Sequence, residues 1–155
     1  MKESLDKAIE ELKREEHLVF VSLKYTRTVD VLKNIIQRMI STFSFGFNAL
    51  LMYAKEQKLI TDYPENQALR CNILKEIYPN ERRLHEYIDY YLKLRKIVRA
   101  EYTKKEEYRR HVTMSVVIDG EPIDITMDSV KEDLERLREF INYVREFIFG
   151  KQEEE

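Results

Sequence analysis

The sequence predicts a mainly α-helical fold with a β-hairpin and a final helix at its C-terminal end. Apolar residues recur at steps of three and four over five or six segments, the period of a helix with one buried face. Strict alternation of apolar and polar residues appears in only one stretch, residues 112–127. With three glycines and three prolines in 155 residues, the chain is expected to form long helices and few loops.

The N-terminal half of the chain is expected to hold three helical segments. The first two have one apolar face each, over residues 5–12 and 29–43. We expect the second helix to break within residues 41–46, because a glycine and two serines weaken a helix there. After it resumes, the loop TDYPENQ leads to a short helix that Pro79 stops.

The next segments are a long helix and the hairpin. The helix is predicted over residues 81–105, with Asn80 as its N-cap. The hairpin is predicted over residues 111–127, and its turn lies in the sequence DGEP. Its apolar face must lie against the helices or against another subunit, because an isolated hairpin is marginally stable.

The last helix is predicted over residues 129–149. Ser129 and Glu132 have the spacing of a capping box at its start. Gly150 ends it, and KQEEE is expected to be a frayed tail. Neither an internal repeat nor a linker is visible, so residues 1–155 are predicted to form a single domain.

Composition limits the compartment and the partners. The 27 basic and 29 acidic residues leave a net charge of -2, so any surface that binds polyanions must be local. The lone Cys71 excludes an internal disulfide and fits a reducing cytoplasm; its apolar neighbours favour a packing role. The charged N-terminus and the short uncharged run 39–54 predict neither signal peptide nor membrane span. Abundant Lys and Glu are typical of a heat-adapted source.

Several kinds of chemistry find no support in the sequence. No Glu-x-x-His pair is present, and three scattered histidines with one cysteine do not predict a metal site. No glycine-rich phosphate loop exists, and no serine or threonine has a histidine at the spacing of a nucleophilic triad. We therefore expect neither a metal nor a cofactor.

One arginine of the long helix falls inside its apolar sector. With Tyr91 at the centre of the inward face, Arg95 lies at about 40° and Arg99 at about 80° from that centre. An inward arginine is costly unless it is paired, reaches solvent or lines a cleft. Arg95 is therefore expected either to pair with a glutamate of a neighbouring helix or to line a cleft or a dimer interface.

The same helix resembles the motif of the HEPN superfamily. HEPN domains have four helices with a short third and a long fourth, and the fourth ends in an arginine–histidine motif. In LRKIVRAEY, Arg95 is followed by four residues, by Ala100 in the place of the histidine, and then by Tyr102. The resemblance covers residues 18–105 and implies an up-and-down helical bundle, with the hairpin and last helix as additions.

The resemblance also implies a function. HEPN ribonucleases hold phosphate with the arginine and use the histidine for proton transfer, which Ala100 cannot perform. The chain is thus similar to a non-catalytic HEPN-like module that binds a nucleotide, RNA or a partner protein. Two alternatives stay open: an endoribonuclease with a site rebuilt from Arg95, Tyr102 and His111, and a purely structural helical partner protein. A nucleotidyltransferase-type partner would place the chain in a toxin–antitoxin pair.

These residues lead to two expectations about the surface. The first is one electropositive site at the end of the long helix, binding phosphate through guanidinium groups and stacking a base on tyrosine. Its predicted members are Arg95, Arg99, Tyr102, Arg109, Arg110 and His111. The second is a homodimer, because the apolar faces of the hairpin and last helix, with an inward arginine, exceed what one small bundle covers.

Overall fold

The computed structural model describes residues 2–150, without the side chains of residues 23 and 24. The predicted tail KQEEE lies outside the described residues. The described chain forms five α-helices and one three-stranded antiparallel sheet, so the predicted fold class is confirmed. In chain order the elements are α1 (Lys2–Tyr25), α2 (Val29–Glu56), α3 (Gln67–Ile77), α4 (Arg82–Arg99), β1 (Tyr102–Lys105), β2 (Thr113–Ile118), β3 (Glu121–Thr126) and α5 (Met127–Phe149).

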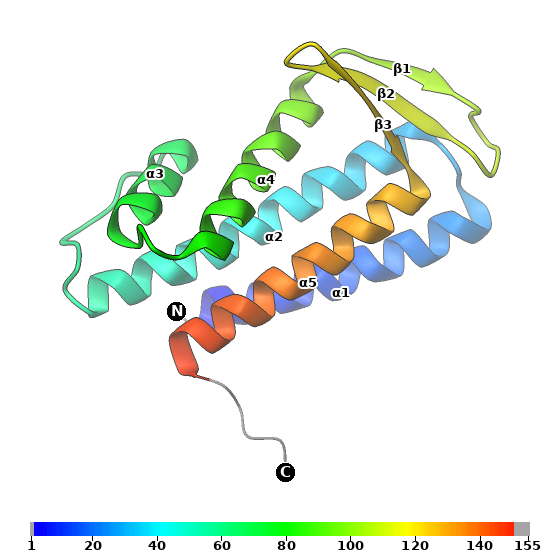
Figure 1. Ribbon diagram of the computed structural model, residues 1–155. Helices are drawn as coiled ribbons and strands as arrows, with labels where there is room; N and C mark the ends of the chain where they lie inside the picture. The colour runs from blue at the N-terminus through cyan, green and yellow to red at the C-terminus, as the bar shows by residue number, and fades with distance from the viewer. Residues whose placement is uncertain (1, 151–155) are drawn as a thin grey trace.

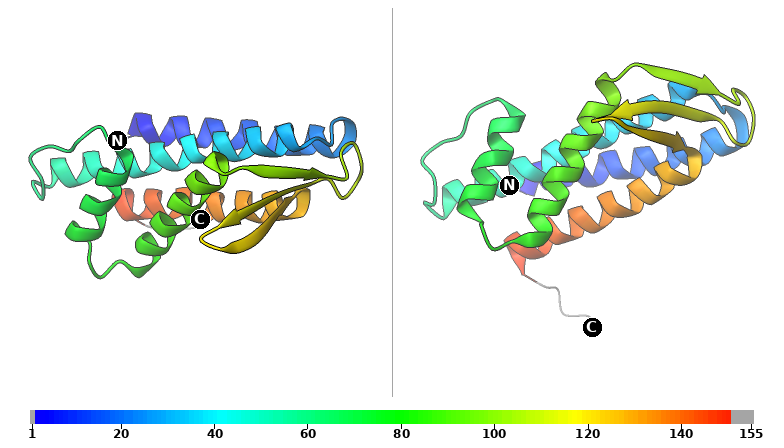
Figure 2. Two further views of the ribbon diagram at one scale, coloured as in Figure 1. Left: turned by 90° about the horizontal axis from the view of Figure 1, so that it is seen from above. Right: turned by 45° about the horizontal axis from the view of Figure 1, so that its top comes forward.

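Helix α2 is the centre of the molecule. It contacts α1, α3, α4, α5 and β2 (Figure 1). The long helices α1 and α2 run side by side in opposite directions, and α5 lies along both. The sheet covers the end of the bundle where the chain turns from α1 into α2 and where α5 begins (Figure 2).

The hydrophobic core draws on all five helices and on strands β2 and β3. It begins with Leu5 near the start of α1 and reaches Val144 in α5. Segments outside residues 18–105 are therefore built into the same core. An aromatic cluster lies at its middle, where the rings of Phe43 and Phe47 pack on Phe140 with centroids 4.9 and 4.8 Å apart.

The predicted break within residues 41–46 is wrong, because α2 continues through it. Side-chain hydroxyls of this segment bond to carbonyls one turn earlier: Thr42 to Arg38 at 3.1 Å and Ser44 to Ile40 at 3.1 Å. These bonds satisfy the polar side chains within the helix. Gly46 serves close packing instead, since a Cβ atom there would lie 2.4 Å from Cε2 of Phe140.

The predicted long helix ends six residues early, at Arg99. Ala100 turns into the extended region, with φ −73° and ψ 152°, and residues 102–105 become β1. This strand pairs antiparallel with β2, with Tyr102 opposite Val116. The ladder hydrogen bonds of β2 thus override the helical propensity of the segment, and the predicted hairpin becomes a three-stranded sheet.

Two predicted helix caps are also corrected. Glu81, not Asn80, is the N-cap of α4, and its side chain makes no capping bond; its carboxylate accepts from the Tyr143 hydroxyl at 2.9 Å. The capping box of α5 is formed by Thr126 and Ser129, so this helix begins two residues before its predicted start. At α5, Thr126 lies three positions before Ser129 and fits the same cap pattern, whereas at α4 the cap moves by one residue.

The hairpin has the predicted apolar face, and its turn is shorter than the predicted DGEP, because Glu121 and Pro122 belong to β3. Strands β2 and β3 pair antiparallel on both sides of a turn at Asp119 and Gly120, whose φ angles are 51° and 83°. Its inward residues Met114, Val116 and Ile125 are buried. The helices of the same chain cover this face, and the opposite face of the sheet stays open.

Candidate functional site

Four of the six predicted site residues lie in two separate places instead of one, and the other two lie in neither. Arg95 and Arg99 line a groove between α2 and α4, whereas Arg110 and His111 line a hollow beside the start of α5. Tyr102 begins the strand between them. Arg109 points into neither hollow and lies 4.0 Å from the carboxylate of Glu106.

The first place is the α2–α4 groove, a shallow hollow of about 190 Å³. One wall is the face of α2 that carries Gln37 and Ile40, which are three residues apart and therefore neighbours on the helix. The other wall is the end of α4, which contributes Arg95, Val98 and Arg99. The groove thus joins an apolar floor to two guanidinium groups.

Arg95 is half-buried and rests on an aromatic ring. Its guanidinium carbon lies 5.6 Å from the ring centroid of Tyr91, a cation–π contact within one turn of α4. The Tyr91 hydroxyl and Ser44 Oγ lie 2.8 Å apart in a hydrogen bond, and burial raises the pKa of this phenol. Within residues 2–150 Arg95 forms no ion pair, so the glutamate partner considered from the sequence is not found.

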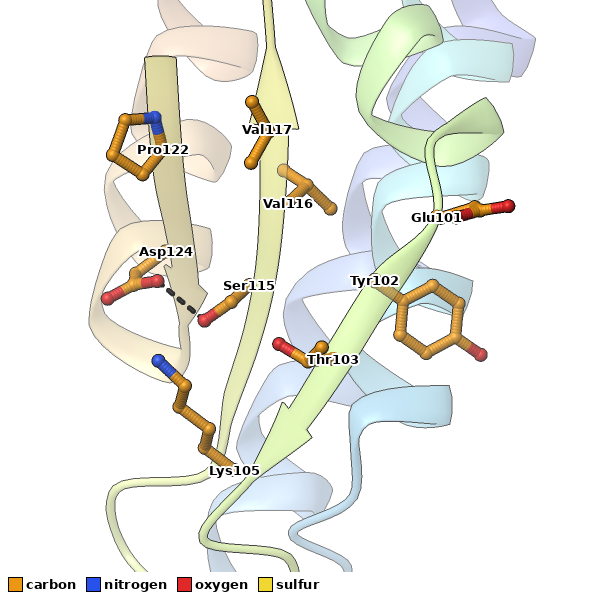
Figure 3. A pocket seen from close by; sticks show the side chains of 9 residues that line it. All are labelled: Glu101, Tyr102, Thr103, Lys105, Ser115, Val116, Val117, Pro122 and Asp124. Carbon is orange, nitrogen blue, oxygen red and sulfur yellow. Dashed lines mark hydrogen bonds between the residues drawn. The ribbon is translucent and has the colours of Figure 1, made fainter. Parts of the chain in front are cut away.

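Tyr102 contacts a lysine on the face of α2 that also lines the groove. The ring is half-buried on the α2 side of β1 (Figure 3), and Lys33 Nζ lies 5.0 Å from its centroid. Lys33 precedes Gln37 by four residues, so both occupy the same face of α2. The expectation that Tyr102 follows Arg95 on one helical face is wrong, because α4 ends between them.

Positive charge is concentrated along the chain that connects the two places. Residues 93–111, here called the basic strip, contain eight lysines and arginines and three glutamates. The whole chain has a net charge of -2, so the remainder is strongly acidic. A local excess of this kind attracts anions even when the total charge of the protein is slightly negative.

The second place is the α5 hollow, with a volume of about 240 Å³. Its charged or ionisable lining groups come from three elements. The turn between α1 and α2 gives Arg27, the turn between β1 and β2 gives Arg110 and His111, and α5 gives Asp128 and Lys131. Among the described residues, Arg110 and Lys131 form no ion pair.

Backbone hydrogen bonds fix the β1–β2 turn, residues 106–112, against the α1–α2 turn. The Tyr108 amide donates to the Arg27 carbonyl at 2.6 Å, and the Val29 amide donates to the Glu107 carboxylate at 3.2 Å. Glu106 and Tyr108 adopt φ angles of 56° and 65°, a region that costs non-glycine residues roughly 1–2 kcal/mol each. The turn is therefore held in one conformation by its neighbours.

The geometry brings together no general acid or base with the groove arginines. Arg95 and His111 line different hollows, and Ala100 has no titratable group. Burial raises the pKa of the Cys71 thiol to about 11, so this thiol is protonated near neutral pH and is a poor nucleophile. The described residues contain no group of three His, Cys, Asp or Glu side chains suited to a metal ion.

A third hollow, of about 520 Å³, lies on the open face of the sheet (Figure 3). Two of its polar residues already partner each other, since Ser115 donates to Asp124 at 2.7 Å. The lining mixes Lys105 and Asp124 with the exposed Val117 and Pro122. This face carries no concentration of one charge.

The residues that sequence reasoning missed include Arg27, Asp128 and Lys131 at the α5 hollow, Gln37 in the groove and Lys33 beside it. Lys33 and Gln37 lie at the edge of the apolar stripe of α2. The helical period predicts this edge position, but it does not predict which residues of other elements they contact. Their neighbours on α4 and β1 are more than fifty residues away in the sequence. Only the packing of these elements reveals the groove.

Comparisons of the chain with protein-family models, with curated proteins and with solved structures give no match. Among residues 2–150, none of the helices has the length and apolarity needed to cross a bilayer.

Proposed function

We propose that this protein is a HEPN-like module that binds single-stranded RNA along the α2–α4 groove and the basic strip without cleaving it. The observation that carries the proposal is that Arg95 and Arg99 line the groove, while Lys33 lies one helical turn before the groove residue Gln37 on the same face of α2. None of these three cations has an ion-pair partner within the described residues. A positively charged groove that follows the phosphate backbone is one component of sequence-tolerant binding to single strands.

Each groove residue has a specific task in this proposal. The Tyr91 ring holds the Arg95 guanidinium, which lowers the entropy lost when its N–H groups donate to a phosphate. Tyr102 positions Lys33 in the same way, so that face of its ring is already occupied by a cation. Gln37 supplies an amide for the ribose or base, and Ile40 and Val98 offer apolar contact to a base.

Binding without turnover follows from the groups that surround the groove. Phosphodiester cleavage by a ribonuclease needs a proton acceptor near the 2′-hydroxyl. The groove lining has arginine, glutamine and aliphatic side chains, and none of these accepts a proton near neutral pH. We also place the protein in the cytoplasm, where the buried Cys71 thiol remains reduced.

Fluorescence polarisation with a labelled single-stranded RNA tests the proposal. Arg95→Ala and Arg99→Ala are each expected to weaken binding about five- to tenfold, the loss of one charge-assisted contact. Arg82→Ala is the matched control, because Arg82 lies about 25 Å away at the other end of α4. Its side chain is 92% exposed and contacts Glu86 only through a surface ion pair of 3.7 Å.

Three results contradict the proposal. Equal losses in Arg82→Ala and Arg95→Ala would indicate general charge attraction. RNA cleavage abolished by His111→Ala would favour the rebuilt endoribonuclease. No RNA binding, with reduced stability in Arg95→Ala, would favour the structural partner protein.

A further inference from the structure

We propose that the α5 hollow recognises the terminal phosphate monoester of the bound RNA strand, an inference that rests on the proposed function. The hollow is lined by three cations from three separate elements: Arg27, Arg110 and Lys131. These three side chains lie far apart in the sequence, and none of them belongs to the hydrophobic core. Guanidinium and ammonium groups are the ligands that phosphate prefers.

The charge of the hollow fits a phosphate end better than an internal phosphodiester. The lining holds three cationic side chains and a single carboxylate, Asp128, and two of the cations, Arg110 and Lys131, form no ion pair within the described residues. A terminal phosphate carries a charge of about −1.5 to −2 near neutral pH, whereas an internal phosphodiester carries only one negative charge. His111 adds a ring N–H donor, and the amino end of α5 adds partial positive charge from its backbone.

The shape of the hollow also fits a strand end. The α1–α2 turn, the β1–β2 turn and the first turn of α5 supply its lining residues. These three segments lie at the same end of the molecule (Figure 2). The hydrogen bond from the Tyr108 amide to the Arg27 carbonyl, 2.6 Å long, joins two of these walls. The walls are thus in place before a ligand arrives, which reduces the ordering cost of binding.

The hollow lies at the far end of the basic strip from the α2–α4 groove. Strand β1 connects them, and its four residues span about 13 Å. A short RNA strand whose interior lies in the groove therefore reaches the hollow with its end. Tyr108, 79% exposed on the turn beside the hollow, offers a free ring to the terminal base.

Calorimetric titration with three RNAs of one sequence tests this inference: one with a 5′-phosphate, one with a 3′-phosphate and one with hydroxyl groups at both ends. One phosphorylated RNA is expected to bind about tenfold more tightly than the hydroxyl-ended RNA. The phosphorylated RNA that binds more tightly shows whether the 5′ or the 3′ end enters the hollow. Arg110→Ala and Lys131→Ala are each expected to remove this preference. Lys131 lies outside the basic strip, so Lys131→Ala is also expected to leave the affinity for hydroxyl-ended RNA unchanged.

The controls separate this inference from the proposed function. Lys105→Ala, a lysine on the open face of the sheet, is expected to keep the preference. Arg95→Ala is expected to weaken all three RNAs by the same factor. Equal affinity of the wild-type protein for all three RNAs overturns the terminal-phosphate site and leaves RNA binding standing if Arg95→Ala still weakens it. Failure of every RNA to bind overturns both.

Discussion

Glu15 is an acidic side chain buried in the interface between α1 and α2. It is 0% exposed, and its Oε1 lies 2.8 Å from Thr42 Oγ1, which is itself 3.1 Å from the Arg38 carbonyl. A hydroxyl has one proton and cannot donate to both oxygens. If Glu15 is protonated, it donates to Thr42 and Thr42 donates to the carbonyl, so both contacts become hydrogen bonds. Burial accordingly raises the pKa of Glu15 to about 8.

The raised pKa of Glu15 predicts that stability falls as pH rises. The folded state keeps this proton up to about pH 8, whereas the unfolded chain loses it near the ordinary value of 4.5. The contribution of Glu15 is fully present below pH 4.5 and is lost as the pH rises through 8. Between these limits the folded state binds more protons, so the free energy of unfolding decreases by about 1.4 kcal/mol per pH unit.

Urea denaturation of the wild-type protein and of Glu15→Gln measures this effect. Glutamine cannot ionise, so the stability of the variant relative to wild type is expected to increase from pH 5.5 to 7.5. The exposed Glu10→Gln on the same helix is the control and is expected to show no such trend. A constant difference between wild type and Glu15→Gln over this range would mean that Glu15 is ionised in the folded protein.

At the scale of single residues, the sequence predicts that Glu15 is buried but not how its carboxyl group is satisfied. Glu15 lies seven residues after Ala8 and seven before Ser22, and both of these residues are buried on the same face of α1. Seven residues are two helical turns, so the spacing places Glu15 on the inner face. Its neighbours Glu11 and Glu16 have the same residue type, and only the position of Thr42 shows how its carboxyl is satisfied.

At the scale of elements, predictions succeeded where a pattern lies within one element and failed where two distant elements decide the structure. The helical period predicted the buried Tyr91, and the strict alternation predicted the apolar face of β2 and β3. Strand β1 has no such pattern, because YTKK continues the composition of the preceding helix. The strand conformation of β1 is imposed by its pairing with β2. Because α4 ends before this strand, the predicted site residues are separated into two places.

Gly46 gives a stability prediction that opposes helix propensity. Alanine is normally more favourable than glycine inside a helix by about 1 kcal/mol. Here the new Cβ would lie 2.4 Å from the Phe140 ring, so Gly46→Ala is expected to destabilise the protein by about 1–3 kcal/mol. Chemical denaturation measures the change, and a second substitution, Phe140→Leu, is expected to restore part of the loss. A stability equal to or above wild type for Gly46→Ala would show that α2 and α5 can separate there at no cost.

At the scale of the whole molecule, the homodimer stays a prediction, but the structure removes observations that supported it. The inner face of the hairpin and the apolar stripe of α5 are covered by helices of the same chain, as the burial of Val116 and Leu137 shows. Arg95 rests on Tyr91, so it needs no partner subunit to satisfy it. Light scattering at micromolar concentration checks the prediction, because a dimer has twice the chain mass of 18.8 kDa.

Positive charge is concentrated in one region of the molecule, so the salt dependence of RNA affinity is the sharpest test of the proposed binding. The proposed path of a hydroxyl-ended strand passes three cations in or beside the groove, named Lys33, Arg95 and Arg99. Each phosphate neutralised on a single strand contributes a slope of about −0.7 to log K against log salt, so a slope of about −2.1 is expected for hydroxyl-ended RNA. Arg95→Ala is expected to reduce its magnitude by about 0.7, whereas Lys13→Ala on the exposed side of α1 is expected to leave it unchanged. A slope near zero would exclude phosphate contacts as the source of affinity. A slope that changes equally in both variants would mean that RNA affinity depends on the total charge of the protein and not on the groove.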